Sequence, residues 1–208
     1  MRKAGYFIVM ILMVTVLIIS SSCNKDIRRT VTEEEWNKNM NAMNYEYSYE
    51  IHSESIFTNL THKRKCKCDT DAFMEKSDHY DFWTYTVKKN GIWYRVEKNL
   101  ENGEPLIERM GESYTGTYSI KQNIALESLY SDYDYSQFVF DEEKGAYTYI
   151  IEEPFFACYI YLFFENGDLA RVEAFAENYD NTEYKRSWIF VFKNINNTVV
   201  DVPEFSIE

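Results

Sequence analysis

The chain has 208 residues, of which 22 are Lys or Arg and 34 are Asp or Glu, so its formal net charge is −12 at pH 7. Such a charge repels phosphate groups, which argues against a nucleic-acid partner and against membrane binding by charge alone. Aromatic residues make up 17% of the chain, with 18 Tyr and 14 Phe against only 7 Gly and 3 Pro. This composition is typical of a folded domain rich in β-strands and excludes a disordered chain.

Residues 1–22 have the three parts of a secretory signal peptide. Arg2 and Lys3 come first, an apolar run covers 6–19, and three serines at 20–22 follow. This order of basic, apolar and small residues is what the export machinery reads. The apolar run is shorter than the roughly 20 residues that a membrane-spanning helix needs. We therefore expect an exported protein without a permanent membrane span.

A cysteine follows the small residues directly, at position 23. The segment 18–23 resembles the lipobox of bacterial lipoproteins, although Ser20 stands where a branched aliphatic residue is usual. We expect cleavage before Cys23 and lipidation of its sulfur, which anchors the protein stably on the extracytoplasmic face of the cell membrane. The alternative is a plain secretory signal with an incidental cysteine. Residues 23–31 would be a short tether, and 32–208 a single domain.

A short helix is expected over 32–43, at the start of this domain. Thr32 and Glu35 have the spacing of a capping box, in which each side chain bonds the other's backbone N–H. Trp36, Met40 and Met43 then follow at helical spacing and form one apolar stripe.

From Asn44 the period changes from helical to two. The residues Tyr45, Tyr47, Tyr49 and Ile51 alternate with polar ones, which predicts a strand with one buried face. Two Asn-Gly pairs further on predict β-hairpins, because both residues accept the positive φ of a type I′ turn. Asn90-Gly91 would join strands 80–88 and 92–98, and Asn166-Gly167 would join strands 155–165 and 168–177.

Further strands are expected at 144–151 and 184–193, where aromatic and aliphatic residues alternate with polar ones. Between the hairpins, 117–130 lacks turn signals and carries apolar residues at loosely helical spacing, which predicts a second helix. A helix, antiparallel strands, a helix and more strands give an α+β domain built on one meandering sheet. The strand at 155–164 is apolar on both faces, so each face needs cover.

Two short motifs and the rhythm of the strands resemble a known group of proteins. The domain opens with Thr32-Glu33-Glu34-Glu35-Trp36 and closes with Phe192-Lys193-Asn194-Ile195 and Thr198-Val199-Val200-Asp201-Val202-Pro203. With the lipobox, these segments make the chain similar to uncharacterised Gram-positive lipoproteins, and in outline to the LolA/LppX lipoprotein carriers. The resemblance implies a curved antiparallel half-barrel whose concave face is covered by one or two helices and can hold acyl chains. It implies no catalytic residues.

From these features we expect a binding protein rather than an enzyme, and we expect no cofactor. Any space beneath the helices would be lined by aromatic rings and would take an apolar or lipid ligand. The expected lining residues are Tyr159, Tyr161, Phe163, Trp188 and Phe190. In the alternative, side chains fill this space completely. The protein would then be a scaffold for other components of the envelope, without a small-molecule ligand.

Three cysteines follow the anchor: Cys66, Cys68 and Cys158. On a strand, Cys66 and Cys68 would point to one face, too strained to pair with each other. Unpaired thiols, one disulfide to Cys158, or a metal or redox site all fit this pattern. None of the standard zinc spacings is present, so we expect no metal site.

The three histidines, His52, His62 and His79, lie among polar residues and outside any Ser-His-Asp pattern, which favours solvated surface positions. Acidic groups such as Asp141-Glu142-Glu143 and Glu152-Glu153 have no EF-hand spacing. They are better interpreted as charged, solvated edges of the sheet.

Overall fold

The structure is a computed structural model that describes residues 30–55, 59–78, 83–98, 104–127, 132–154, 156–178, 185–202 and 204–205. The expected signal peptide and Cys23 lie outside the described residues, as does His79. No helix within the described ranges combines the length and the hydropathy of a membrane span.

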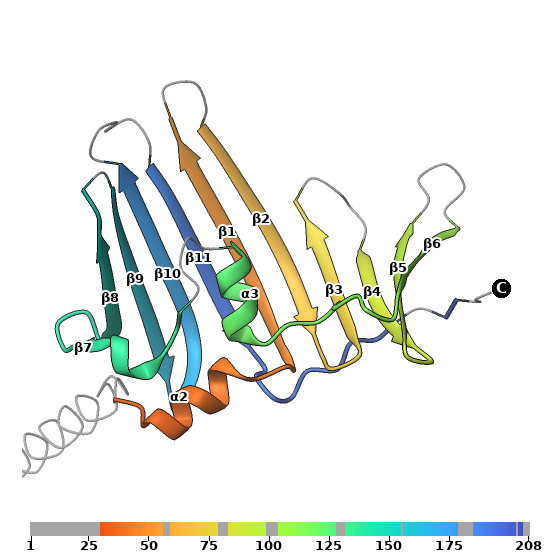
Figure 1. Ribbon diagram of the computed structural model, residues 1–208, viewed down its shortest axis with the longest axis horizontal. Helices are drawn as coiled ribbons and strands as arrows, with labels where there is room; N and C mark the ends of the chain where they lie inside the picture. The colour runs from red at the N-terminus through yellow and green to blue at the C-terminus, as the bar shows by residue number, and fades with distance from the viewer. Residues whose placement is uncertain are drawn as a thin grey trace, which may run out of the picture.

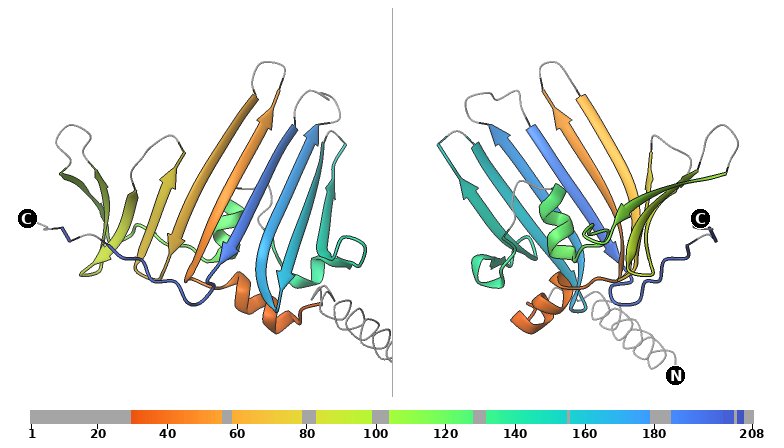
Figure 2. Two further views of the ribbon diagram at one scale, coloured as in Figure 1. Left: turned by 180° about the vertical axis from the view of Figure 1, so that it is seen from behind. Right: turned by 45° about the vertical axis from the view of Figure 1, so that its right-hand side comes forward.

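The strands of the described residues form one open antiparallel sheet (Figure 1). They are β1 (Tyr45–Glu54), β2 (Asn59–Cys68), β3 (Ala72–Ser77), β4 (Thr84–Lys89), β5 (Ile92–Lys98), β6 (Pro105–Gly111), β7 (Val139–Asp141), β8 (Ala146–Glu152), β9 (Phe156–Glu165), β10 (Asp168–Asn178) and β11 (Lys185–Lys193). Their order is β6-β5-β4-β3-β2-β1-β11-β10-β9-β8-β7. The sheet is curved and not closed into a barrel, which confirms the predicted α+β fold with a half-barrel sheet (Figure 2).

The strands that come first and last along the chain, β1 and β11, pair with each other at the centre of the sheet. β1 lies between β2 and β11, and Tyr49 faces Phe190 across the β1–β11 ladder. One meander, β1 to β6, extends to one side, and a second, β7 to β11, extends to the other. The N-terminal and C-terminal parts of the domain are therefore held together by main-chain hydrogen bonds.

Of the described α-helices, α3 (Ile120–Glu127) lies against the concave face of the sheet, and α2 (Glu33–Met40) lies across the lower end of that face (Figure 2). α2 begins with the predicted capping box: Glu35 N–H donates to Thr32 Oγ1 over 3.1 Å, and Thr32 N–H donates to Glu35 Oε2 over 2.9 Å. Of the predicted second helix at 117–130, 128–130 lie outside the described residues and 120–127 form α3. It starts at Ile120 because Ser119 and Gln122 form a cap of the same kind.

The two predicted hairpins are confirmed by their turns. Asn90 and Gly91 have φ angles of 54° and 80°, and Asn166 and Gly167 have 55° and 89°. Positive φ at both central positions is the mark of a type I′ turn, whose twist matches that of the strands. Of the first predicted strand, residues 84–88 are confirmed in β4, and 80–82 lie outside the described residues.

The sheet carries two apolar cores, one on each face. The larger core lies between the helices and the half of the sheet formed by β1, β2 and β8–β11, and it includes Trp36, Ile124 and Trp188. The smaller core lies on the opposite face of β3–β5, around Met74 and Val96. The C-terminal segment covers it, with Val200 buried and Phe205 packed against the cluster. The two apolar cores therefore lie on opposite faces of the sheet.

Asp69, at the turn after β2, ties the C-terminal segment to the sheet. Its Oδ2 accepts a hydrogen bond of 2.8 Å from Val200 N–H, and its Oδ1 accepts from Asp71 N–H and Ala72 N–H at 2.9 and 2.8 Å. One carboxylate thus shapes the turn into β3 and fixes the segment that covers the smaller core.

Candidate functional site

The candidate site is the face of β1 and β8–β11 that carries α2 and α3, which we call the helix-covered face. Cross-strand partners share one face of a sheet, so the register defines its rows of side chains. One row runs through Tyr147, Leu162, Val172, Phe190 and Tyr49. All five are buried. We call the opposite side the helix-free face.

Aromatic rings stack along the centre of the helix-covered face. The Tyr49 and Phe190 rings lie 5.6 Å apart at an interplanar angle of 25°, and those of Tyr47 and Phe192 lie 5.8 Å apart at 27°. Offset stacking of this kind adds to the free energy gained by burying the rings. The centre of the face is therefore a rigid, apolar floor.

A buried polar network joins this floor to α3. Tyr45 Oη–H donates to Tyr118 O over 2.8 Å, Asn123 Nδ2–H donates to Tyr45 Oη over 3.0 Å, and Tyr47 Oη–H donates to Asn123 Oδ1 over 3.2 Å. Burial raises the pKa of Tyr45 and that of Tyr47 well above the usual value, because a phenolate would lose its hydration there. The space under α3 is filled by paired groups, so it is not the place for a ligand.

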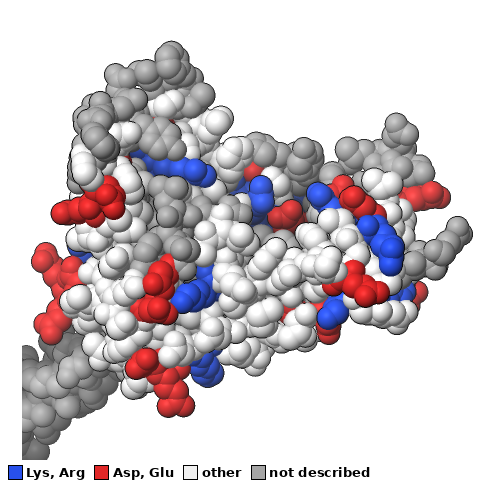
Figure 3. Space-filling model, viewed as in Figure 1, with Lys and Arg blue, Asp and Glu red and all other residues white. Residues whose placement is uncertain are grey.

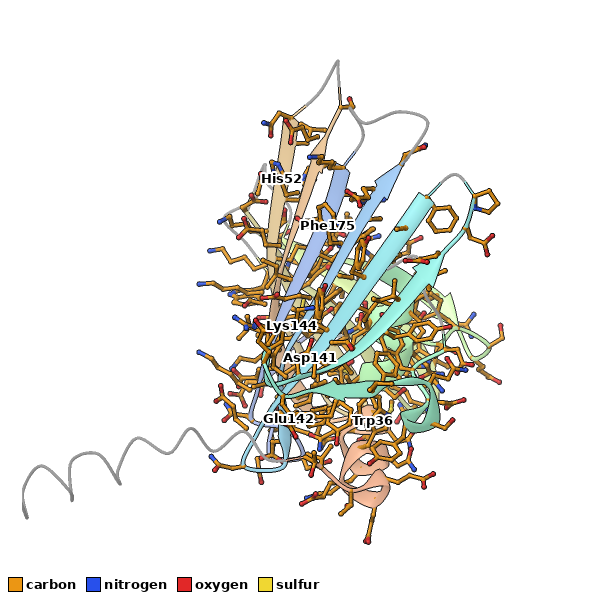
Figure 4. The ribbon with its side chains drawn as sticks, turned by 90° about the vertical axis from the view of Figure 1, so that its left-hand side faces the viewer. Trp36, His52, Asp141, Glu142, Lys144 and Phe175 are labelled. Atoms are coloured by element: carbon orange, nitrogen blue, oxygen red, sulfur yellow. The ribbon has the colours of Figure 1, made fainter. Side chains whose placement is uncertain are left out.

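α2 is fixed equally firmly at the lower end of the sheet. Trp36, a residue of α2 (Figure 4), is fully buried, and its Nε1–H donates to Tyr133 O over 3.0 Å. Asn39 Nδ2–H donates to Gly167 O, and Asn39 Oδ1 accepts from Leu169 N–H, both over 2.8 Å. These bonds attach α2 to the turn between β9 and β10.

The start of the domain is held at the same end. Val31 N–H donates to Tyr147 Oη and Tyr147 Oη–H donates to Val31 O, each over 2.9 Å. Burial raises the pKa of Tyr147 to about 12. The point where the expected tether reaches the domain is therefore fixed next to α2.

The structure divides the five predicted lining residues between two faces. Trp188 and Phe190 lie on the helix-covered face and are buried. Tyr159, Tyr161 and Phe163 lie on the helix-free face and are half-buried. Because β9 is apolar on both sides, its sequence gave no sign of which alternate set faces the helices. The prediction that all five line one space is corrected.

Charged side chains cover the predicted rings on the helix-free face. Lys144 Nζ lies 4.9 Å from the centre of the Tyr161 ring, and the Arg171 guanidinium lies 4.1 Å from that of Phe163. Tyr159 pairs with the Phe175 ring at 6.3 Å. Figure 4 shows Lys144, in the turn between β7 and β8, and Phe175, on β10, away from α2. Cations over ring faces give this apolar surface partial cover.

One end of the helix-covered face is open, at the β2 side. Leu60 is 51% exposed and His62 is exposed, while Ile51, which faces His62 across the β1–β2 ladder, is buried. Trp188 faces Ile51 from the other side and is also buried. In Figure 3, which views this side of the molecule, charged groups are scattered and much of the surface between them is uncharged. The buried side chains of Ile51 and Trp188 thus lie next to a solvent-exposed end of the face, which carries the apolar Leu60 and the polar His62.

Cys66, Cys68 and Cys158 are buried, and the described residues contain no disulfide between them. Cys66 and Cys68 lie on β2 and Cys158 on β9, with β1, β11 and β10 between them. At the usual spacing of strands this separates them by about 19 Å. Disulfide-bonded residues have Cα atoms within about 7 Å of each other, so the geometry excludes a bridge to Cys158. Burial raises the pKa of Cys68 and that of Cys158 to about 11, which makes both thiols unreactive.

The titratable groups form no catalytic cluster in the part of the chain that the structure describes. His52 Nδ1 and Thr61 Oγ1 lie 3.0 Å apart. A backbone hydrogen bond from Lys144 lowers the pKa of Asp141, and Lys121 pairs with Asp134 at 2.9 Å. No three His, Cys, Asp or Glu side chains come together there as a metal site would require.

No protein-family model matches the chain, and no curated protein matches its sequence. Among solved structures, the S-type phycobiliprotein lyase from Guillardia theta aligns at 9% identity over 81% of this chain and 94% of that chain, with a TM-score of 0.34. A LolA superfamily protein from Nitrosomonas europaea aligns at 6% identity over 84% and 96%, with a TM-score of 0.31.

A putative outer membrane lipoprotein-sorting protein domain from Vibrio parahaemolyticus aligns at 10% identity over 77% of this chain and 89% of that chain, with a TM-score of 0.29. Likenesses this distant assign neither ligand nor activity.

Proposed function

We propose that this protein is a lipoprotein of the extracytoplasmic membrane surface that binds an apolar or amphipathic ligand on its helix-covered face. The observation that carries the ligand proposal is the open β2 end of that face. There, exposed Leu60 lies diagonally across the β1–β2 ladder from buried Ile51, which pairs with buried Trp188. An exposed apolar surface that continues into a core is typical of a ligand or partner site.

The anchor in this proposal is Cys23, which follows a complete signal sequence. Residues 23–31 span at most about 29 Å when fully extended. Because Val31 is hydrogen-bonded to Tyr147, the lipid would keep this corner of the domain close to the membrane. The ligand site would then lie within reach of lipid.

The anchor is tested by metabolic labelling with a radioactive fatty acid. The wild-type chain should incorporate label and partition into detergent, whereas the Cys23→Ser chain should do neither. Label that survives this substitution contradicts the proposed anchor.

The ligand site is tested by titrating a fluorescent fatty acid against the protein. Leu60→Asp places a charge at the open end of the helix-covered face and should weaken binding about tenfold or more. Ile150→Asp is the matched control, because Ile150 is 49% exposed but lies on the helix-free face, opposite Tyr159. Absence of saturable binding to the wild type, or equal losses in both variants, contradicts this site.

A scaffold without a small-molecule ligand is the second candidate. It is favoured by exposed apolar residues on the helix-free face, of which Ile150 and Ile189 are 49% and 39% exposed. In that case, Ile150→Asp should release envelope proteins that crosslink to the wild-type chain, and Leu60→Asp should not.

A further inference from the structure

Two neighbouring donor nitrogens on the helix-covered face are buried without a hydrogen-bond partner among the described residues. They are Nε of Arg186 and Nε1 of Trp188. The Trp188 side chain is 0% exposed, and the Arg186 guanidinium carbon lies 4.8 Å from the centre of its ring. Buried N–H groups in proteins almost always have an acceptor. Two adjacent donors that lack one indicate a position for an oxygen of a ligand.

The cross-strand neighbours of these donors on β10 are small, and the ladder on the other side of Arg186 ends at an exposed residue. Arg186 faces Ala176 across the β10–β11 ladder, and Trp188 faces Ala174. An alanine side chain rises little above its strand and leaves room beside a longer one. On the other side, Arg186 faces Ser53, which in turn faces exposed Leu60. The two donors therefore lie beside the open end of the face.

The helix-free face provides a direct comparison. There Arg171 also stacks on a ring, that of Phe163, but its Nε forms an ion pair with Glu173 Oε1 at 3.2 Å. The chain thus supplies a carboxylate to one stacked arginine and none, among the described residues, to Nε of the other. The chain has 34 Asp and Glu residues against 22 Lys and Arg, so carboxylate acceptors are abundant. The lack of one at Nε of Arg186 is therefore unexpected.

We propose that Arg186 and Trp188 bind the anionic headgroup of an amphipathic ligand, a carboxylate or a phosphate, while its apolar part contacts Ile51 and Leu60. This inference rests on the proposed function and specifies the ligand. An indole N–H only donates, and a guanidinium donates as a cation, so together they select an anionic acceptor. A purely apolar ligand would leave both donors unsatisfied.

Native mass spectrometry of the full-length chain tests this with three ligands that share one hexadecyl chain length. The probes are hexadecanoic acid, hexadecan-1-ol and hexadecyl phosphate, each added to protein purified in a non-ionic detergent. The acid, the phosphate or both should be retained at least about tenfold more than the alcohol, as expected for a charge-assisted hydrogen bond. The stronger of the two anions identifies the headgroup chemistry.

Substitutions then test whether Arg186 and Trp188 cause the selective retention of the anionic ligand. Arg186→Gln and Trp188→Phe should each lower retention of the preferred anion about tenfold and leave that of the alcohol unchanged. Arg186→Lys keeps the charge but lacks Nε and should lose selectivity in part. Arg171→Gln is the matched control on the helix-free face and should retain the anion like the wild type.

Three outcomes overturn the headgroup proposal. Equal retention of acid, phosphate and alcohol contradicts it while supporting the proposed ligand site. Selectivity for an anion that Arg186→Gln and Trp188→Phe leave intact places the headgroup elsewhere. Retention of none of the three contradicts the proposed function itself.

Discussion

The two halves of the sheet bury their apolar residues on opposite faces. In the half formed by β1, β2 and β8–β11, two helices cover the concave face, and Trp36, Trp188 and several stacked rings fill the core. In the half formed by β3–β6, the C-terminal segment covers the other face of β3–β5, and the core consists of smaller side chains such as Val87 and Val96. The difference places the large apolar surface, and with it the candidate ligand site, in one half only.

The difference also determines how each half responds to substitution. A core of large rings under helices loses much free energy of folding when one ring is removed, since the surrounding elements cannot close the cavity. A core of small side chains under an extended segment has less to lose from a truncation. Stability measurements on matched variants of the two halves test the comparison.

The largest effect is expected for Trp36→Ala. The Trp36 ring lies 5.1 Å from that of Phe138 and 5.3 Å from that of Tyr147, and its Nε1–H donates to Tyr133 O. Its removal should lower the free energy of unfolding by about 3–5 kcal/mol, measured by urea denaturation. Val96→Ala, in the smaller core, should cost about 2 kcal/mol. If Trp36→Ala and Val96→Ala lower the free energy of unfolding equally, the two cores do not differ as proposed.

The next effect concerns the tie between the C-terminal segment and the smaller core. Asp69→Ala removes the acceptor for three backbone N–H groups, those of Asp71, Ala72 and Val200. The free energy of unfolding should fall by about 2–3 kcal/mol, because each donor loses a charged partner. Asp69→Asn, which keeps one carbonyl oxygen, should lose less. Limited proteolysis should cut the C-terminal segment faster in the alanine variant, and an unchanged rate would exclude the tie.

The sequence predicted those elements whose signal is local. The capping box of Thr32 and Glu35 and the two Asn-Gly turns depend on a few adjacent residues, and the structure contains them. Strand β2 was not predicted, because Lys63, Lys65 and Lys67 give it a charged rather than an apolar face. The structure pairs Lys63 with Glu50 at 2.8 Å and Lys67 with Glu46 at 3.4 Å across the β1–β2 ladder. Such pairing depends on a distant partner strand.

The candidate site was only half predictable for the same reason. Trp188 and Phe190 lie on the helix-covered face, as predicted. The three predicted residues of β9 lie on the helix-free face. The pairing of β9 with β10 determines which face of β9 meets the helices, and the sequence of β9 alone does not show this pairing. Arg186 was missed, although its position two residues before Trp188 on one strand places both on one face. The lack of an acceptor for its Nε is visible only in three dimensions.

A smaller effect is expected at Gly116, where the chain passes closely over the half of the sheet with the smaller core. A Cβ at this position would lie 2.6 Å from Trp93 Cζ3 and 2.7 Å from Thr86 Cγ2. Gly116→Ala should therefore lower the free energy of unfolding by roughly 1–3 kcal/mol through overpacking. Adding Trp93→Leu, which removes the ring, should cancel most of the cost of the alanine. If Gly116→Ala lowers the free energy of unfolding as much in the Trp93→Leu background as in the wild type, crowding against Trp93 is not the cause of the loss.

The smallest effect is expected from the buried thiols, and it appears only in alkali. Burial raises the pKa of Cys68 and that of Cys158 to about 11, above the ordinary value of about 9 for an unfolded chain. The folded state therefore holds these protons more tightly, so the stabilisation is fully present below pH 9 and is lost as the pH rises towards 11. At pH 10 each thiol should lower the free energy of unfolding by about 1 kcal/mol relative to pH 8. Urea denaturation at the two pH values measures the total loss, and Cys158→Ala should remove about 1 kcal/mol of it. Cys68 and the buried tyrosines, whose pKa is also raised, keep their share of the loss in this variant. A loss that is the same in Cys158→Ala as in the wild type would show that Cys158 does not hold its proton more tightly in the folded state.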